Sequence, residues 1–140
     1  MFAPRMSLPD HLARHRLAGL FLDSTPYNAH TTASDALWAG LPVLTILGDT
    51  FASRVAASLL HAIGLPELIA ESPEAYERMA VDLATDPSRL AALRTRLAAN
   101  RLTAPLFDTK RFTRHIEAAY TTMYERHRAG IAPDHIVVPA

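Results

Sequence analysis

The segment Asn28–Asp35 places polar side chains where a short apolar run, Leu17–Leu22, gives way to a predicted helix. In open α/β sheets ligands bind where a strand ends and a helix begins, and the free amides of a helix start attract phosphate. The hydroxyls of Thr31 and Thr32 can add hydrogen bonds, and Asp35, one turn later, can accept from the two hydroxyls of a ribose. The segment therefore predicts a nucleotide site.

The same residues also have a purely structural interpretation. Thr32 and Asp35 match the Thr-x-x-Asp form of an N-terminal capping box, in which the two residues satisfy the first amides of the helix. The predicted helix covers residues 32–39, with Thr32 as its cap and Gly40 as its end. The residues alone leave both interpretations open.

Apolar runs and helical patterns alternate along the first half of the chain. The predicted strands are 17–22, 43–47 and 68–70, and helices are predicted at 32–39, at 51–63 and from a Ser72 cap with Pro73 in its first position. This alternation predicts an α/β fold with a parallel sheet. From residue 73 onward the pattern is helical, so residues 1–72 are expected to form β/α units and residues 73–140 a helical cap. Three strands are few for an open sheet, which suggests part of a larger fold.

Composition excludes several classes of function. The 140 residues carry 14 basic and 14 acidic side chains and no cysteine, so neither nucleic acid nor a membrane surface is an expected partner. Disulfides and thiolate chemistry are excluded. No secretory leader is recognisable, and no apolar run approaches the roughly 20 residues of a membrane span. We expect a soluble, cytoplasmic protein.

Other candidate residues have structural explanations. His11 and His15 would share a helical face, but without a third ligand nearby they do not predict a metal site. Trp38 lies among apolar helical neighbours and is expected in the core. Four arginines in the carboxyl-terminal half are expected to form a solvated helical face: Arg89, Arg94, Arg96 and Arg101.

Many short motifs, in order and at matching spacing, resemble one family. They are Leu22-Asp23, Asn28, His30-Thr31-Thr32, Asp35, Leu37-Trp38-Ala39-Gly40, Pro42, the run 53–58, 68–70, Tyr76, Pro105-Leu106-Phe107 and Pro133-Asp134-His135. Together they cover nearly the whole chain. The chain resembles the carboxyl-terminal part of the catalytic region of O-linked N-acetylglucosamine transferases of the SPINDLY type. The resemblance implies a GT-B fold, of which this chain would be a partial Rossmann-like sheet with a helical carboxyl-terminal third.

The resemblance also implies roles for individual residues. His30, Thr31 and Thr32 would contact the diphosphate of UDP-N-acetylglucosamine, and Asp35 would bind the ribose. The remaining implied contacts lie upstream: the backbone of Met6 beside uracil, and His11 and Arg14 beside the base. Two positions depart from the family pattern, Leu8 where some members have a ribose-contacting lysine and Gly19 where an acidic residue is common.

The family's phosphate-neutralising lysine and acceptor-side histidines would precede Met1, and the single lysine here is Lys110. The resemblance therefore implies no catalytic residue and no metal or cofactor in this chain, with UDP-N-acetylglucosamine as donor substrate. An amino-terminal catalytic half, tetratricopeptide repeats and a protein acceptor would complete the enzyme. We expect a UDP-sugar-binding portion that is inactive alone. The alternatives are a non-catalytic binding or interaction module and part of another GT-B sugar-nucleotide enzyme.

Overall fold

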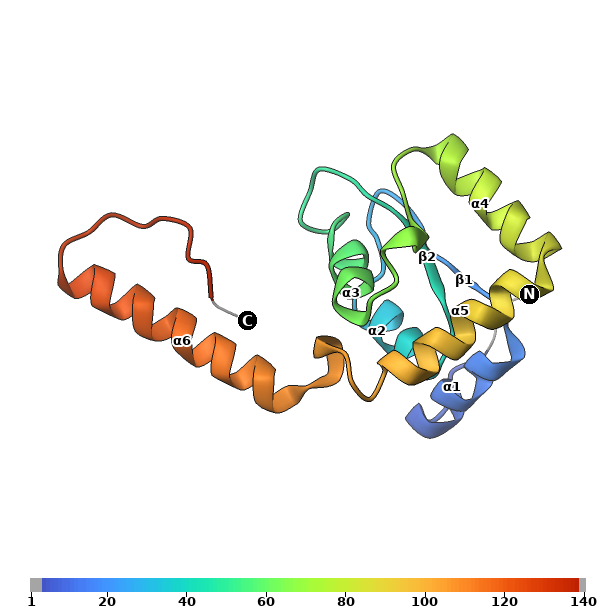
Figure 1. The fold of residues 1–140 in the computed structure, drawn as a ribbon, viewed down its shortest axis with the longest axis horizontal. Helices are drawn as coiled ribbons and strands as arrows, with labels where there is room; N and C mark the ends of the chain where they lie inside the picture. The colour runs from blue at the N-terminus through green and yellow to red at the C-terminus, as the bar shows by residue number, and fades with distance from the viewer. Residues whose placement is uncertain (1–3, 139–140) are drawn as a thin grey trace. The chain divides into compact units, whose positions relative to one another are not determined.

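The computed structural model describes residues 4–138. One compact unit ends at Leu106 and a second begins at Phe107. The first unit contains the sheet and the helices that cover it (Figure 1).

The sheet has three parallel strands in the order β1 (Phe21–Leu22), β2 (Val43–Ile46) and β3 (Ile69–Ala70). This confirms the predicted parallel sheet. The strands are shorter than the apolar runs that predicted them; Leu17, for example, belongs to a 3₁₀ turn, η1 (His15–Leu17). The central strand β2 pairs on both sides, and its uninterrupted Val-Leu-Thr-Ile run is typical of a strand covered on both faces.

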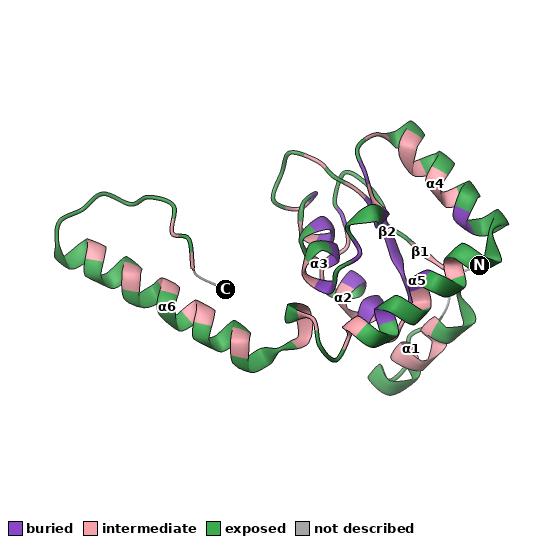
Figure 2. Ribbon diagram, viewed as in Figure 1, coloured by how far each residue is buried: buried purple, intermediate pink, exposed green. Residues whose placement is uncertain are grey.

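Five α-helices belong to the first unit: α1 (Leu8–Arg14), α2 (Thr31–Trp38), α3 (Val55–Ile63), α4 (Pro73–Thr85) and α5 (Pro87–Asn100). In Figure 1, α2 and α3 lie on one side of β2 and α4 lies on the other. Buried residues concentrate in β2, α2 and α3 and on the inner face of α5 (Figure 2). The largest fully buried side chains are Leu37, Leu44, Leu60, Ile63, Leu65, Leu68, Leu83 and Leu97.

The start of α4 matches its prediction. Ser72 caps the helix by accepting from the amide of Ala75 at 3.1 Å, and Pro73 occupies the first turn. The helix predicted from Phe51 begins four residues later, at Val55. The reason is a turn in which the hydroxyl of Ser53 accepts from the amide of Thr50 at 3.0 Å, because such side-chain bonds compete with helix formation.

Of two expectations for the helical residues, the one for Trp38 was wrong and the one for the four arginines held only in part, because Arg89 and Arg96 are exposed whereas Arg94 and Arg101 are half-buried. Trp38 is 47% exposed rather than in the core, and the guanidinium of Arg101 lies 5.6 Å from its ring centroid. Three of the four arginines expected to be solvated reach other elements: Arg94 donates to the main-chain oxygen of Ala18, Arg96 pairs with Glu67, and Arg101 donates to that of Trp38 at 2.7 Å. Long arginine side chains thus fasten α5 to the rest of the unit.

The second unit consists of α6 (Thr109–Arg128) and a segment that folds back along it (Figure 1). Arg126 holds this segment by donating to the main-chain oxygen of Ala132 at 2.7 Å. No residue of α6 is buried (Figure 2), and its apolar residues Phe112, Tyr120 and Met123 are more than half exposed.

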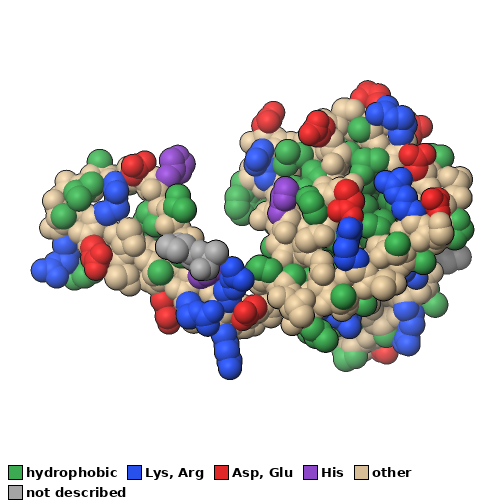
Figure 3. All heavy atoms as spheres, in the orientation of Figure 1, with side chains coloured by type: hydrophobic (Ala, Val, Ile, Leu, Met, Phe, Trp, Pro, Cys, Tyr) green, Lys and Arg blue, Asp and Glu red, His purple; other side chains and the backbone are tan. Residues whose placement is uncertain are grey.

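On the face of the first unit seen in Figure 3, basic and acidic side chains are interspersed.

Candidate functional site

Asp23 follows β1 directly and organises the loop that leads to α2. The residue is 6% exposed. Oδ1 accepts from the amide of Ala29 at 2.7 Å and from that of Ser24 at 2.9 Å, and Oδ2 accepts from the hydroxyl of Thr45 at 2.6 Å. Hydrogen bonds to an ionised acceptor are among the strongest in proteins. The carboxylate therefore closes the loop onto the carboxyl end of the sheet.

Asn28 ties the same loop to β2. Its side-chain nitrogen donates to the hydroxyl of Thr45 and to the main-chain oxygen of Ile46, both at 2.9 Å. The side-chain oxygen of Asn28 is buried and has no hydrogen-bond partner within residues 4–138. The contribution of Thr45 was not predicted, and the only signal in the sequence is one hydroxyl inside an apolar run.

Helix α2 begins without a side-chain cap. His30 is the N-cap residue, and the first helical amide with a main-chain acceptor is that of Ser34, which donates to His30 O at 3.0 Å. Within the described residues, the amides of Thr31, Thr32 and Ala33 have no acceptor. Thr32 lies inside the helix and makes no bond with Asp35, so the capping-box interpretation is wrong. The helix start keeps free the donors that attract anions.

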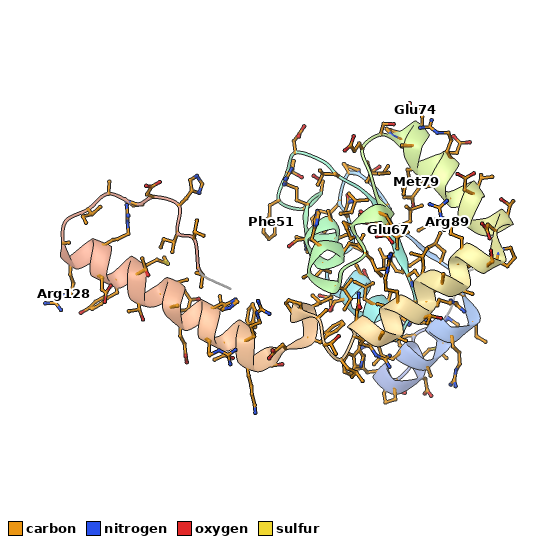
Figure 4. All side chains as sticks on the ribbon, viewed as in Figure 1. Phe51, Glu67, Glu74, Met79, Arg89 and Arg128 are labelled. Atoms are coloured by element: carbon orange, nitrogen blue, oxygen red, sulfur yellow. The ribbon has the colours of Figure 1, made fainter. Side chains whose placement is uncertain are left out.

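The imidazole of His30 is held in one place by three neighbours. Nε2 lies 3.1 Å from the main-chain oxygen of Ala52, so Nε2 carries the proton in this contact. Tyr27 stacks on the ring at a centroid distance of 5.2 Å, and Phe51 meets it edge-on at 5.9 Å. Phe51 is 82% exposed and projects from the loop after β2 (Figure 4). His30 therefore links the two loops that follow β1 and β2.

A shallow pocket of about 280 Å³ lies at this edge of the sheet. It is lined by Phe21, Leu22, Asp23, Ser24, Tyr27, Asn28, Ala29, His30 and Thr32. Both Thr31 and Thr32 are exposed at the helix start. Asp35 is half-buried one turn later; its main-chain oxygen accepts from the amide of Ala39, but its carboxylate makes no hydrogen bond or ion pair within the described chain. The structure thus brings His30 and Thr32 together at one pocket.

The upstream candidates lie on or before α1. Met6 is 45% exposed and precedes the helix, whereas His11 and Arg14 are half-buried on it. None of the three lines the pocket. Across residues 4–138, no hydrogen bond, ion pair or ring contact joins either basic residue to His30 or Asp35. Their contribution to the same site stays a prediction.

Among the described residues, no three histidine, cysteine, aspartate or glutamate side chains lie close enough together to hold a metal ion. His11 and His15 pack edge to face with centroids 4.9 Å apart, and Nδ1 of His15 lies 2.9 Å from the main-chain oxygen of His11. In the same part of the chain, no helix combines the length and the apolar character needed to cross a membrane.

Comparison with known proteins gives a consistent result. A sequence profile described as Glycosyl transferase family 41 matches residues 1–116. Over 130 residues the chain is 44% identical to a probable UDP-N-acetylglucosamine–peptide N-acetylglucosaminyltransferase, SEC, of Arabidopsis thaliana, covering 92% of this chain and 13% of the relative. It is 39% identical over 127 residues to the UDP-N-acetylglucosamine–peptide N-acetylglucosaminyltransferase of Caenorhabditis elegans, covering 91% of this chain and 11% of that protein.

A solved structure with a similar fold is also a glycosyltransferase. A mutant O-GlcNAc transferase of Thermobaculum terrenum superposes with a TM-score of 0.79 at 37% identity, over 87% of this chain and 23% of that one. The expected partial Rossmann-like fold of GT-B type is therefore confirmed. The chain spans only 11–13% of the length of the two curated relatives.

Proposed function

The chain belongs to glycosyl transferase family 41, and from this membership we propose that it is the UDP-N-acetylglucosamine-binding portion of a protein O-N-acetylglucosaminyltransferase. One observation carries the proposal within this chain. The start of α2 presents three amides without acceptors beside a pocket at the carboxyl edge of a parallel sheet, which is where such sheets bind nucleotides.

The proposed contacts follow the chemistry of each group. The amides of Thr31 and Thr32, their hydroxyls and His30 bind the diphosphate, because the helix start carries roughly half a positive charge. The carboxylate of Asp35, which lies one turn further into α2 and has no partner in the described chain, accepts from the ribose hydroxyls. The uracil base is contacted by three residues on or before α1: Met6, His11 and Arg14.

In an inverting transfer to Ser or Thr, no covalent protein intermediate forms, and the protein stabilises the negative charge of the departing diphosphate. The helix start offsets only part of that charge, and the chain's single lysine, Lys110, lies in the second unit. We therefore propose that this chain binds UDP weakly and transfers no sugar by itself. The acceptor protein, the amino-terminal half and the repeats belong to the proposed full enzyme.

The test is a titration of the ¹⁵N-labelled chain with UDP, followed by NMR. The amide signals of Thr31, Thr32 and Ala33 should move progressively, and Thr32→Ala should weaken the titration. Thr95→Ala is a matched control, because Thr95 lies on α5 and its hydroxyl bonds only the main-chain oxygen of Ala91, at 3.0 Å. The absence of any shift at millimolar UDP would refute nucleotide binding.

A radiolabelled UDP-N-acetylglucosamine assay with a Ser/Thr acceptor peptide tests the second half of the proposal. No transfer is expected from this chain. Transfer that Asp35→Ala abolishes would support the site and overturn the proposed inactivity of the isolated chain.

A further inference from the structure

A directed chain of buried hydrogen bonds joins the loop before α2 to the ends of two strands. The hydroxyl of Thr45 donates to Asp23 Oδ2 at 2.6 Å, and this bond commits its single proton. Thr45 can then only accept at its remaining lone pairs, and Asn28 supplies the donor at 2.9 Å. The direction runs from Asn28 through Thr45 to Asp23.

The same logic sets the orientation of the Asn28 amide. Its nitrogen faces two acceptors, Thr45 Oγ1 and the main-chain oxygen of Ile46. A reversed amide would place Oδ1 against both acceptors and lose both bonds. The observed orientation leaves Oδ1 of Asn28, a residue only 1% exposed, without a partner in the described residues, and Asn28 lines the pocket beside the α2 start.

Thr45 lies beside Asp23 because of the strand register. Leu22 of β1 pairs with Leu44 of β2, so the residues that follow them, Asp23 and Thr45, become neighbours. Asp23 in turn accepts from the amide of Ala29, the residue before the N-cap His30. Since no side chain caps α2, two consecutive loop residues, Asn28 and Ala29, fix where its first turn begins, and both depend on this chain of bonds.

We propose that Thr45 is a positioning residue for the phosphate-binding helix start: its hydroxyl, relaying between Asn28 and Asp23, holds the free amides of α2 where a diphosphate can reach them. This inference rests on the proposed function. Thr45 is itself fully buried in β2 and lies outside the residues that line the pocket. It therefore acts through the loop rather than by touching the ligand.

The test compares Thr45→Val, which keeps the shape but removes the hydroxyl, with Thr45→Ser, which keeps the hydroxyl. Dissociation constants for UDP and for inorganic pyrophosphate are measured by NMR at a temperature where thermal unfolding shows every variant to be fully folded. Thr45→Val should raise the dissociation constants of both ligands by about tenfold, corresponding to about 1.4 kcal/mol. The dissociation constants of Thr45→Ser should remain within about twofold of those of the parent chain. Equal affinities for Thr45→Val and the parent chain would overturn the proposal.

Two further measurements cover the remaining outcomes. If Thr45→Val does not fold, Asn28→Ala removes the first link while the bond between Thr45 and Asp23 stays, and undiminished pyrophosphate binding by that variant would overturn the proposal. If the parent chain itself binds no UDP, the proposed function fails. The positioning role is then decided by ligand-free hydrogen exchange of the two bonded amides at the helix start, those of Ala29 and Ser34. Their exchange should be faster in Thr45→Val than in Thr45→Ser, and equal exchange would contradict the positioning role.

Discussion

The hydroxyl of Tyr76 donates a 2.8 Å hydrogen bond to the main-chain oxygen of Asp23, a residue 53 positions earlier in the sequence. Tyr76 lies on α4, which packs against β2 and β3. Asp23 begins the loop that leads to the α2 start. A helix on one side of the sheet thus helps to fix the loop that serves the helix on its other side (Figure 1).

This contact predicts a stability that falls at high pH. Burial first, and the negative charge of Asp23 second, raise the pKa of Tyr76 above its ordinary value of 10.0. The folded chain therefore holds the phenolic proton more tightly than the unfolded chain, so the stabilisation is complete below pH 10 and is lost as the pH rises above it. Tyr76→Phe should lower the free energy of unfolding by about 1 kcal/mol at pH 7 and flatten the alkaline decline.

Urea unfolding between pH 7 and pH 11 checks this prediction. Tyr120→Phe is the matched control, because Tyr120 is 62% exposed in the second unit. An alkaline decline that is equally steep in Tyr76→Phe and in the parent chain would contradict the assignment to Tyr76.

A second prediction concerns the turn before α3. A Cβ atom at Gly48 would lie 2.6 Å from Cβ of Ser53 and closer still to its hydroxyl oxygen. Ser53 cannot move away easily, because it exchanges hydrogen bonds with Thr50. Gly48→Ala should therefore destabilise the chain by about 1–3 kcal/mol, as measured by thermal unfolding. Gly19→Ala, where the nearest neighbour is the flexible side chain of Leu90 at 3.3 Å, should cost less; an equal or larger cost there would disagree with this explanation.

The opposite end of α2 gives a third prediction. Arg101 donates to the main-chain oxygen of Trp38 at 2.7 Å and lies over its ring, so it adds a hydrogen bond to a carbonyl at the helix end. Arg101→Ala should destabilise the chain by about 1–2 kcal/mol and change the fluorescence of Trp38, the only tryptophan. Arg89→Ala, in the helix α5 that ends just before Arg101, should leave that emission unchanged. Unaltered Trp38 emission in Arg101→Ala would exclude the contact.

Sequence reasoning succeeded where local chemistry decides the structure. The Ser72-Pro73 start of α4 and the parallel pairing of three apolar runs needed only capping chemistry and the alternation of patterns. It failed where distant residues decide. Trp38 looks apolar in its own helix, yet its surroundings depend on Arg101, 63 positions later. Similarly, Thr32 and Asp35 have the spacing of a capping box, but the loop that Asp23 closes places the N-cap at His30, two residues earlier.

The candidate site was predictable to the same extent. That a helix begins after the loop, at the motif His30-Thr31-Thr32, followed from the order of strand, loop and helix; nucleotide binding at that helix start stays a prediction. The buried support beneath it was not, because the role of Thr45 depends on the register between β1 and β2. Nothing in a single sequence specifies that register.

The proposed site makes a final prediction about which part of the nucleotide each residue binds. Thr32 offers an amide and a hydroxyl at the helix start. Thr32→Ala should therefore weaken the binding of UDP and of inorganic pyrophosphate by about tenfold, as loss of a bond to a charged group does. Uridine binding should be unchanged. Asp35 lies one turn further into α2. Asp35→Ala should therefore weaken the binding of UDP and of uridine by about tenfold or more and leave pyrophosphate binding unchanged. Parallel NMR titrations with the three ligands separate these patterns. If Asp35→Ala weakens pyrophosphate as much as uridine, Asp35 shapes the helix start instead of binding ribose.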